Sequence, residues 1–191
     1  MRSKVLGLVA VGLLAGPMAA SGATLLVNGS GILTGATGVN ISGVLYDVEF
    51  VEGTCVALFT GCDDAGDFLF TTQAAATDAS WALLDQVFVD GPSGQFDSVP
   101  NLTFGCTNDL YCYGVTLYYS NVGARNMDAL NFSAASGIPD EVIGPFFDPD
   151  SAERGDLTYA KWALSRVPEP GTLALLGLGL AGLGLSRRRR A

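Results

Sequence analysis

Hydrophobic and polar residues alternate along two long segments of this chain. Between positions 44 and 51, apolar residues stand at every second position, with Asp47 and Glu49 among the residues between them. A longer alternation runs from Tyr111 to Tyr119. Because successive side chains of a strand point to opposite faces, this period of two predicts a half-buried strand in each segment. Shorter apolar runs predict further strands at 68–71 and 158–167.

One segment between these strands has helical spacing instead. In residues 73–89, Trp81, Leu84 and Phe88 recur on one side of a helix, and this pattern predicts that the three form its buried face. The sequence Gly91-Pro92-Ser93-Gly94 predicts a turn after it. Together these patterns predict a mainly β fold, either a sheet or a sandwich, with one packed α-helix.

The first 23 residues have the pattern of a secretory signal peptide. Arg2 and Lys4 precede an apolar stretch at 5–14, and small residues lead to a cleavage site between Ala23 and Thr24. An uncleaved membrane anchor is the alternative, but about ten apolar residues are too few to cross roughly 30 Å of hydrocarbon. The expected partner here is signal peptidase.

The last 25 residues contain a second apolar segment. Leu173–Leu185 carries no charge, is preceded by two prolines and is followed by four arginines. A helix over 170–185 would be about 24 Å long at 1.5 Å per residue, a short membrane span. We therefore expect a C-terminal hydrophobic helix that inserts in the membrane. The positive cluster places its end on the cytoplasmic side and the rest of the chain outside.

This C-terminal segment, 167–191, resembles the PEP-CTERM sorting signal of Gram-negative bacteria, which is also known as an ice-binding-protein C-terminal domain. The resemblance implies recognition by an exosortase-type membrane protease, transient residence in the inner membrane, and delivery to the cell envelope or an exopolysaccharide matrix. It assigns the recognition motif to Pro168, Glu169 and Pro170, and the cytoplasmic stop to Arg187, Arg188, Arg189 and Arg190. It implies nothing about the activity of the preceding domain.

That preceding domain, residues 24–166, is strongly acidic. It has four basic residues against 18 carboxylates, a formal charge of −14, and the chain contains no histidine. The charge excludes nucleic acid as an expected partner, because phosphate would be repelled. The lack of histidine removes serine–histidine and cysteine–histidine catalysis. Segments 43–50, 53–55 and 61–63 resemble uncharacterised PEP-CTERM proteins, which implies a secreted, disulfide-bearing domain and no particular activity.

Four cysteines form two close pairs in this exported domain. We expect the disulfides Cys55–Cys62 and Cys106–Cys112, because an oxidising compartment favours disulfides. A four-cysteine zinc site is the alternative, although neither pair has the shorter separation typical of such sites.

Clustered carboxylates provide weak candidates for a metal site. Calcium prefers oxygen ligands, and four acidic residues fall within nine positions, but the Gly and Glu of the helix-loop-helix calcium pattern are missing. We therefore assign no metal or other cofactor, with calcium as the one candidate. The acidic residues are Asp148, Asp150, Glu153 and Asp156, and a second group of similar strength is Asp63, Asp64 and Asp67.

The sequence as a whole favours a non-enzymatic envelope or matrix protein with a structural or adhesive role. Calcium-bridged contact with an anionic exopolysaccharide is the expected interaction. One alternative is a secreted glycoside hydrolase that uses a pair of carboxylates. Another is a carbohydrate-binding module, which would require the tyrosines of the predicted strand to be exposed and coplanar. Those tyrosines are Tyr111, Tyr113, Tyr118 and Tyr119.

Overall fold

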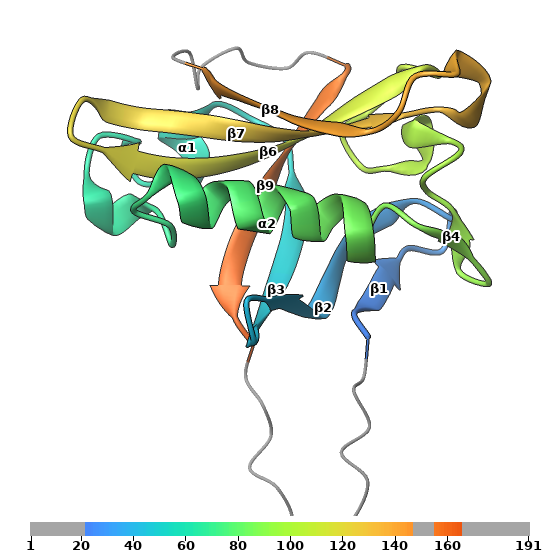
Figure 1. The fold of residues 1–191 in the computed structure, drawn as a ribbon, viewed down its shortest axis with the longest axis horizontal. Helices are drawn as coiled ribbons and strands as arrows, with labels where there is room; N and C mark the ends of the chain where they lie inside the picture. Colours follow the sequence, from blue (N-terminus) through green and yellow to red (C-terminus); the bar gives the residue numbers. More distant parts are fainter. Residues whose placement is uncertain (1–21, 147–154, 166–191) are drawn as a thin grey trace, which may run out of the picture.

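Seven strands form one continuous twisted sheet, with a long helix across one face (Figure 1). The computed structural model describes residues 22–146 and 155–165. The strand order is β1-β2-β3-β9-β6-β7-β8, and β4 and β5 form a separate ribbon. The strands are β1 Thr24–Val27, β2 Leu33–Ile41, β3 Val44–Val51, β4 Asp90–Gly91, β5 Gly94–Gln95, β6 Tyr111–Ser120, β7 Gly123–Phe132, β8 Glu141–Phe146 and β9 Leu157–Leu164. The helices are α1 Cys55–Leu58, α2 Gln73–Gln86 and the 3₁₀ turns η1 Ala65–Asp67, η2 Pro100–Leu102 and η3 Ala134–Ser136.

The last strand in sequence, β9, lies in the middle of the sheet. It pairs antiparallel with β3, where Tyr46 faces Leu164, and parallel with β6, where Tyr113 faces Leu157. The N-terminal strands β1–β3 and the later strands β6–β8 are each consecutive antiparallel runs. Strand β9 therefore joins two halves of the sheet that are formed by earlier parts of the chain.

Helix α2 is fixed at both ends. The Thr72 hydroxyl accepts a hydrogen bond from the backbone N–H of Ala75 at 3.2 Å, which caps the first turn. At the other end, the side chain of Gln86 accepts from the Asn40 N–H at 2.9 Å and donates to the Asn40 carbonyl at 2.8 Å. These contacts join the last turn of the helix to β2.

The face of α2 that lies on the sheet carries three small residues, Ala76, Ala79 and Ser80, together with Leu83, and all four are fully buried. The predicted buried face is confirmed for Leu84 and Phe88, at 8% and 1% exposure, and is wrong for Trp81. Trp81 is 44% exposed, because it lies away from this row of small side chains.

A glycine in β6 lets the helix approach the sheet closely. A Cβ atom on Gly114 would lie 3.0 Å from the ring of Phe88 and 3.1 Å from Leu83. Nearby, the buried Ser80 hydroxyl donates to the Met127 carbonyl at 3.0 Å. Short side chains on both surfaces thus bring the helix and sheet backbones together.

Two hydrophobic clusters lie on opposite faces of the sheet. The larger one fills the space between α2 and the sheet, where the rings of Phe50 and Phe88 stack with centroids 5.4 Å apart. The smaller one lies beside α1 and the segment that follows it. Its buried members are Cys55, Phe59, Phe68, Val115, Leu117, Leu157 and Tyr159. The centre of β6 is consequently buried on both faces.

The mainly β fold with one packed helix is confirmed, as are the strands at 44–51 and 111–119 and most of the one at 158–167. The strand predicted at 68–71 was wrong. Phe70 forms only an isolated bridge with Tyr118, because the chain turns into α2 directly after it. Its neighbour Phe68 packs into the smaller cluster instead.

The expected C-terminal hydrophobic helix lies outside the described residues. Within residues 22–146 and 155–165, no helix has the length and apolar character needed to span a membrane.

Candidate functional site

The predicted signal-peptide cleavage site directly precedes β1. Thr24 is exposed and is the first residue of that strand, whereas Ala23 is half buried against the larger cluster. Cleavage between the two stays a prediction, and it would leave β1 complete. The predicted sorting residues lie outside the described part of the chain: Pro168, Glu169, Pro170, Arg187, Arg188, Arg189 and Arg190.

The described chain is held in place up to Ser165. Its backbone N–H donates to the carbonyl of Leu45 at 3.0 Å, and its hydroxyl is hydrogen-bonded to the Asp47 carboxylate. Asp47 also accepts from the N–H of Gly38 at 3.0 Å, at an irregularity of β2. Asp47 therefore ties the end of β9 to β2 and β3, a role that no local sequence pattern indicated.

Both expected disulfides are present. The Cα atoms are 5.6 Å apart in Cys55–Cys62 and 5.7 Å apart in Cys106–Cys112, within the usual range for disulfide bonds. All cysteines are therefore paired, and the four-cysteine zinc alternative is wrong. Each bond closes a short loop, the first around α1 and the second just before β6.

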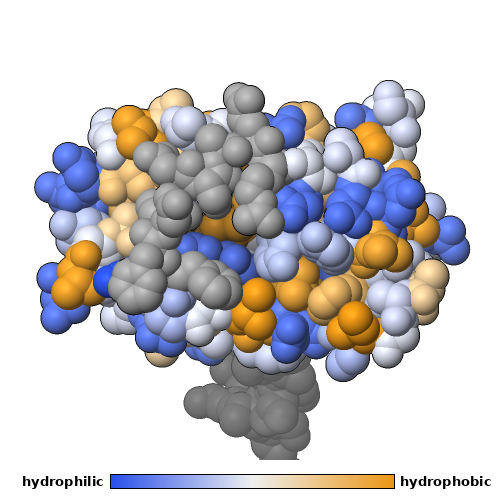
Figure 2. Space-filling view, turned by 90° about the horizontal axis from the view of Figure 1, so that it is seen from above, coloured by the Kyte–Doolittle hydropathy of each residue, from blue (hydrophilic) through white to orange (hydrophobic). Residues whose placement is uncertain are grey.

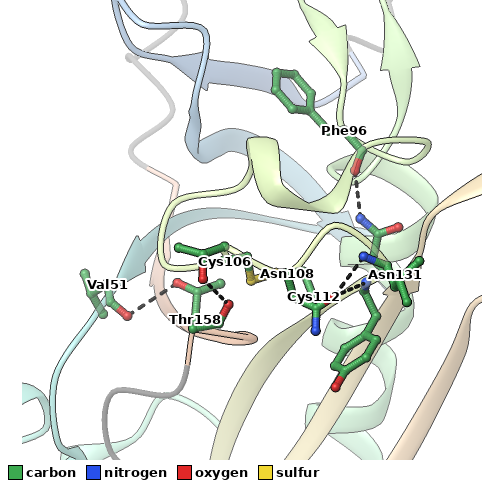
Figure 3. The surroundings of a disulfide bond; sticks show 11 residues. Val51, Phe96, Cys106, Asn108, Cys112, Asn131 and Thr158 are labelled. Atoms are coloured by element: carbon green, nitrogen blue, oxygen red, sulfur yellow. Dashed lines mark hydrogen bonds between the residues drawn. A yellow bond between two sulfur atoms is a disulfide. The ribbon is translucent and has the colours of Figure 1, made fainter.

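The disulfide between Cys106 and Cys112 is buried among polar groups, whereas the loop that it closes is largely exposed (Figure 3). Asn108 Oδ1 accepts from the backbone N–H of Leu110 at 2.8 Å, which shapes the loop. Asn131 lies opposite Cys112 in the β6–β7 ladder, is fully buried, and donates through Nδ2 to the Phe96 carbonyl at 2.7 Å. These bonds fix backbone geometry and therefore favour a structural role for the region.

The predicted calcium ligands are only partly within the described residues. Asp148, Asp150 and Glu153 lie outside them, and Asp156 forms a backbone bridge with Cys106. The calcium assignment at this cluster stays a prediction.

The second acidic group, at 63–67, caps a short turn. Asp67 Oδ2 accepts from the backbone N–H groups of Asp63 and Asp64 at 3.1 and 3.0 Å, and Asp64 Oδ1 accepts from Gly66 N–H at 3.0 Å. These two carboxylates thus form a capping box at the start of η1, one bonding an N–H within it and the other the N–H groups just before it. In the described part of the chain, no three acidic or cysteine side chains gather closely enough to hold a metal ion.

A shallow groove of about 860 Å³ opens on the sheet face opposite α2. Val48 and Phe50 of β3 pack on the α2 side, so by alternation Asp47 and Glu49 point to the groove side. We call this surface the open-face groove. Its lining residues are Leu26, Thr34, Ala36, Thr37, Asp47, Val48, Glu49, Phe50, Val51, Glu52, Leu58, Phe104, Lys161, Trp162 and Ala163.

The open-face groove combines acidic side chains with exposed apolar ones. Glu49 and Glu52 are exposed, as are Leu26 at 42% and Phe104 at 37%. Lys161 faces Glu49 across the β3–β9 ladder, and its ammonium group donates to the Leu58 carbonyl at 3.3 Å. The alternation of residues 44–51 already placed the acidic residues on one face, whereas the lining from β1 and β9 had no comparable local signal.

The strand tyrosines do not form a flat aromatic surface. Tyr118 is only 3% exposed, on the α2 side of β6. The rings of Tyr111 and Tyr113 meet edge to face at an interplanar angle of 81°. The condition set for the carbohydrate-binding alternative, exposed and coplanar rings, is therefore not met on this strand.

One carboxyl pair went unnoticed in the sequence. Asp97, after β5, and Asp140, before β8, are in hydrogen-bond contact, and Asp140 also accepts from the Phe132 N–H at 2.7 Å. Burial raises the pKa of Asp140, and the charge and hydrogen bond of Asp97 raise it further. The two groups touch, whereas the carboxyls of glycosidases stand about 5–10 Å apart around the sugar. Their spacing does not support the hydrolase alternative.

Comparison with known families found one match, at the C-terminal end of the chain. Residues 166–190 match the PEP-CTERM protein-sorting motif. Comparisons with curated proteins and with solved structures found no match. The matched residues begin directly after Ser165, the last described residue.

This motif confirms the sorting signal expected from the sequence. It supports export of the protein and membrane-associated sorting by an exosortase-type protease. The match covers 166–190 only, so the resemblance of the preceding domain to uncharacterised PEP-CTERM proteins stays a prediction.

Proposed function

We propose that this protein is a non-enzymatic component of the cell envelope or extracellular matrix, with a structural or adhesive role. The observation that carries the proposal is the sorting motif at 166–190, which follows the folded domain without a spacer. The motif accounts for delivery of the protein, so the preceding domain is the part that acts at the final location. A folded β domain with two disulfides suits a structural or adhesive role in an oxidising compartment.

The open-face groove is the proposed contact surface of the domain. Its carboxylates belong to a domain of formal charge −14, which would repel an anionic polysaccharide. A divalent cation between the two removes this repulsion, and calcium prefers carboxylate oxygens. Glu49 and Glu52 are exposed for such bridging, while Leu26 and Phe104 offer apolar surface to sugar rings. These features support calcium-bridged binding of an anionic exopolysaccharide.

Retention of the protein in native matrix tests this proposal. The variant Glu49→Gln/Glu52→Gln removes two groove charges, and Asp85→Asn/Glu141→Gln removes two exposed charges from α2 and β8 as a control. We expect the groove variant, and chelation of calcium with EGTA, to release protein into the medium, and the control to stay in the matrix. The proposal fails if calcium changes neither retention nor thermal stability, or if both variants behave alike.

A further inference from the structure

Both ends of the described chain lie at one edge of the molecule. Figure 1 shows the start of β1 and the end of β9 at the same lower edge, beside the turn that joins β2 to β3. The hydrogen bond from Ser165 N–H to Leu45, next to that turn, agrees with this placement. The edge is thus the part of the folded domain from which the sorting motif continues.

Apolar side chains of β3 and β9 are exposed at this edge, beside the β2–β3 turn. Val44 is 45% exposed and Leu164 is 59% exposed, and alternation places both on the α2 side of the sheet. Ser42 and Gly43 form the turn with positive φ values of 51° and 90°, as a tight hairpin requires. We call these four residues the hairpin rim. None is charged, although the Ser42 hydroxyl bonds the exposed Asp78 carboxylate at 3.4 Å.

The sequence after Ser165 keeps this rim close to a membrane. Only residues 166–172 separate Ser165 from the uncharged segment that begins at Leu173. Seven residues reach at most about 25 Å when fully extended. The domain cannot move far from the bilayer while that segment is inserted, and the edge bearing Ser165 is the part nearest to it.

We propose that the hairpin rim rests on the lipid surface while the precursor awaits sorting. Moving the exposed valine and leucine from water into the interfacial region lowers the free energy of the system. The nearby tail supplies the second anchoring element that stable membrane association needs. The acidic domain is repelled by anionic headgroups, so the surface that fits is zwitterionic. This inference rests on membrane-associated sorting and does not depend on the polysaccharide role proposed above.

The β6–β7 turn, at the left end of these two strands in Figure 1, offers a comparison with the rim. Figure 2, seen from above Figure 1, shows hydrophobic atoms as separate spots among hydrophilic ones. Val122, in the β6–β7 turn, is 67% exposed, more than either rim residue. It provides a control, because exposure alone would favour membrane contact there as well.

Fluorescence quenching in vesicles tests the inference. The native cysteines are all paired, so Val44→Cys, Leu164→Cys and Val122→Cys each offer one thiol for an environment-sensitive fluorophore. The full chain is reconstituted in vesicles of equal parts phosphatidylethanolamine and phosphatidylcholine that contain brominated lipid. We expect a blue shift and quenching at positions 44 and 164, a much smaller effect at 122, and weaker quenching when phosphatidylglycerol is added.

The contrary outcomes are distinct. Equal quenching at all three positions, or none at 44 and 164 in chains that float with the vesicles, overturns the rim contact alone. Chains that fail to float overturn it together with the membrane-held precursor. Shielding of position 44 only when an exosortase-type protease is present assigns the rim to that protein instead of lipid. None of these results bears on calcium-dependent retention.

Discussion

The two faces of the sheet are covered in different ways. Helix α2 spans one face and seals the larger hydrophobic cluster beneath a row of small side chains. The other face carries the smaller cluster under α1 and its following loop, and beyond it the open-face groove remains exposed. The α2 face therefore contributes to stability alone. The other face contributes to stability through the smaller cluster and also leaves the open-face groove available for binding. Glu49 and Glu52 of the groove are exposed, so water solvates their charges and no buried partner is needed.

The largest expected effect contrasts the two clusters. Phe88→Ala should lower the free energy of unfolding by about 3–5 kcal/mol, because the cavity forms in a sealed core that cannot collapse. Phe59→Ala should cost about 3 kcal/mol or less, because Phe59 is 8% exposed and its loop can close around the gap. Urea denaturation measures both. An equal or greater loss at Phe59 would show that the α1 side is as rigid as the α2 side.

The disulfides give a second comparison, since Cys55 belongs to the smaller cluster and Cys112 lies on the α2 side of β6. Replacing both partners of either bond with alanine should lower the free energy of unfolding by about 2–3 kcal/mol, the value for loops of this length. The Cys106/Cys112 change should also loosen the loop around Asn108, and amide hydrogen exchange would detect this. Unchanged exchange there would contradict the assigned structural role.

Asp97 and Asp140 belong to neither hydrophobic cluster, so their effect on stability can be measured apart from the packing of the two faces. Because the folded-state pKa of Asp140 is raised, the stability it contributes is present at acidic pH and is lost as the pH rises through that pKa. Asp140→Asn keeps an acceptor for the Phe132 N–H and removes the repulsion from Asp97. The melting temperature of this variant should exceed that of the wild type increasingly from acidic to neutral pH. A constant difference would contradict this assignment.

The smallest effect on stability is expected in the open-face groove. Glu49→Gln and Lys161→Met change exposed side chains, so each should alter the free energy of unfolding by about 0.5 kcal/mol or less. Chemical denaturation checks this directly. A loss above 1 kcal/mol would mean that these side chains support the fold, and the distinction between the two faces would weaken.

Local patterns in the sequence predicted some elements well. The alternations at 44–51 and 111–119 are strands, and the segment from Gln73 is a helix. The large hydrophobic residues predicted the buried face of that helix correctly at Leu84 and Phe88 but not at Trp81, because the contact also relies on Ala, Ser and the absent side chain of Gly114. Close packing of backbones has no strong hydrophobic signal in a single sequence.

Long-range pairings were equally hidden. Nothing local indicates that β9 inserts between β3 and β6, or that Ser165 bonds to Leu45 and Asp47. The groove and the Asp97–Asp140 contact depend on those pairings, so they could not be predicted either. The sorting motif and the disulfides were predictable, because their signal lies in residues that are close together in sequence.

Intact-mass spectrometry of the protein from native envelope and culture medium, with and without reductant, tests the central claim most directly. The claim is that a disulfide-bonded domain passes at Ser165 into a sorting motif that is processed after export. The predicted mass begins near Thr24, ends near Pro168–Pro170, and rises by about four protons on reduction. An unprocessed C-terminus confined to the membrane fraction, or no mass change with reductant, would contradict the account.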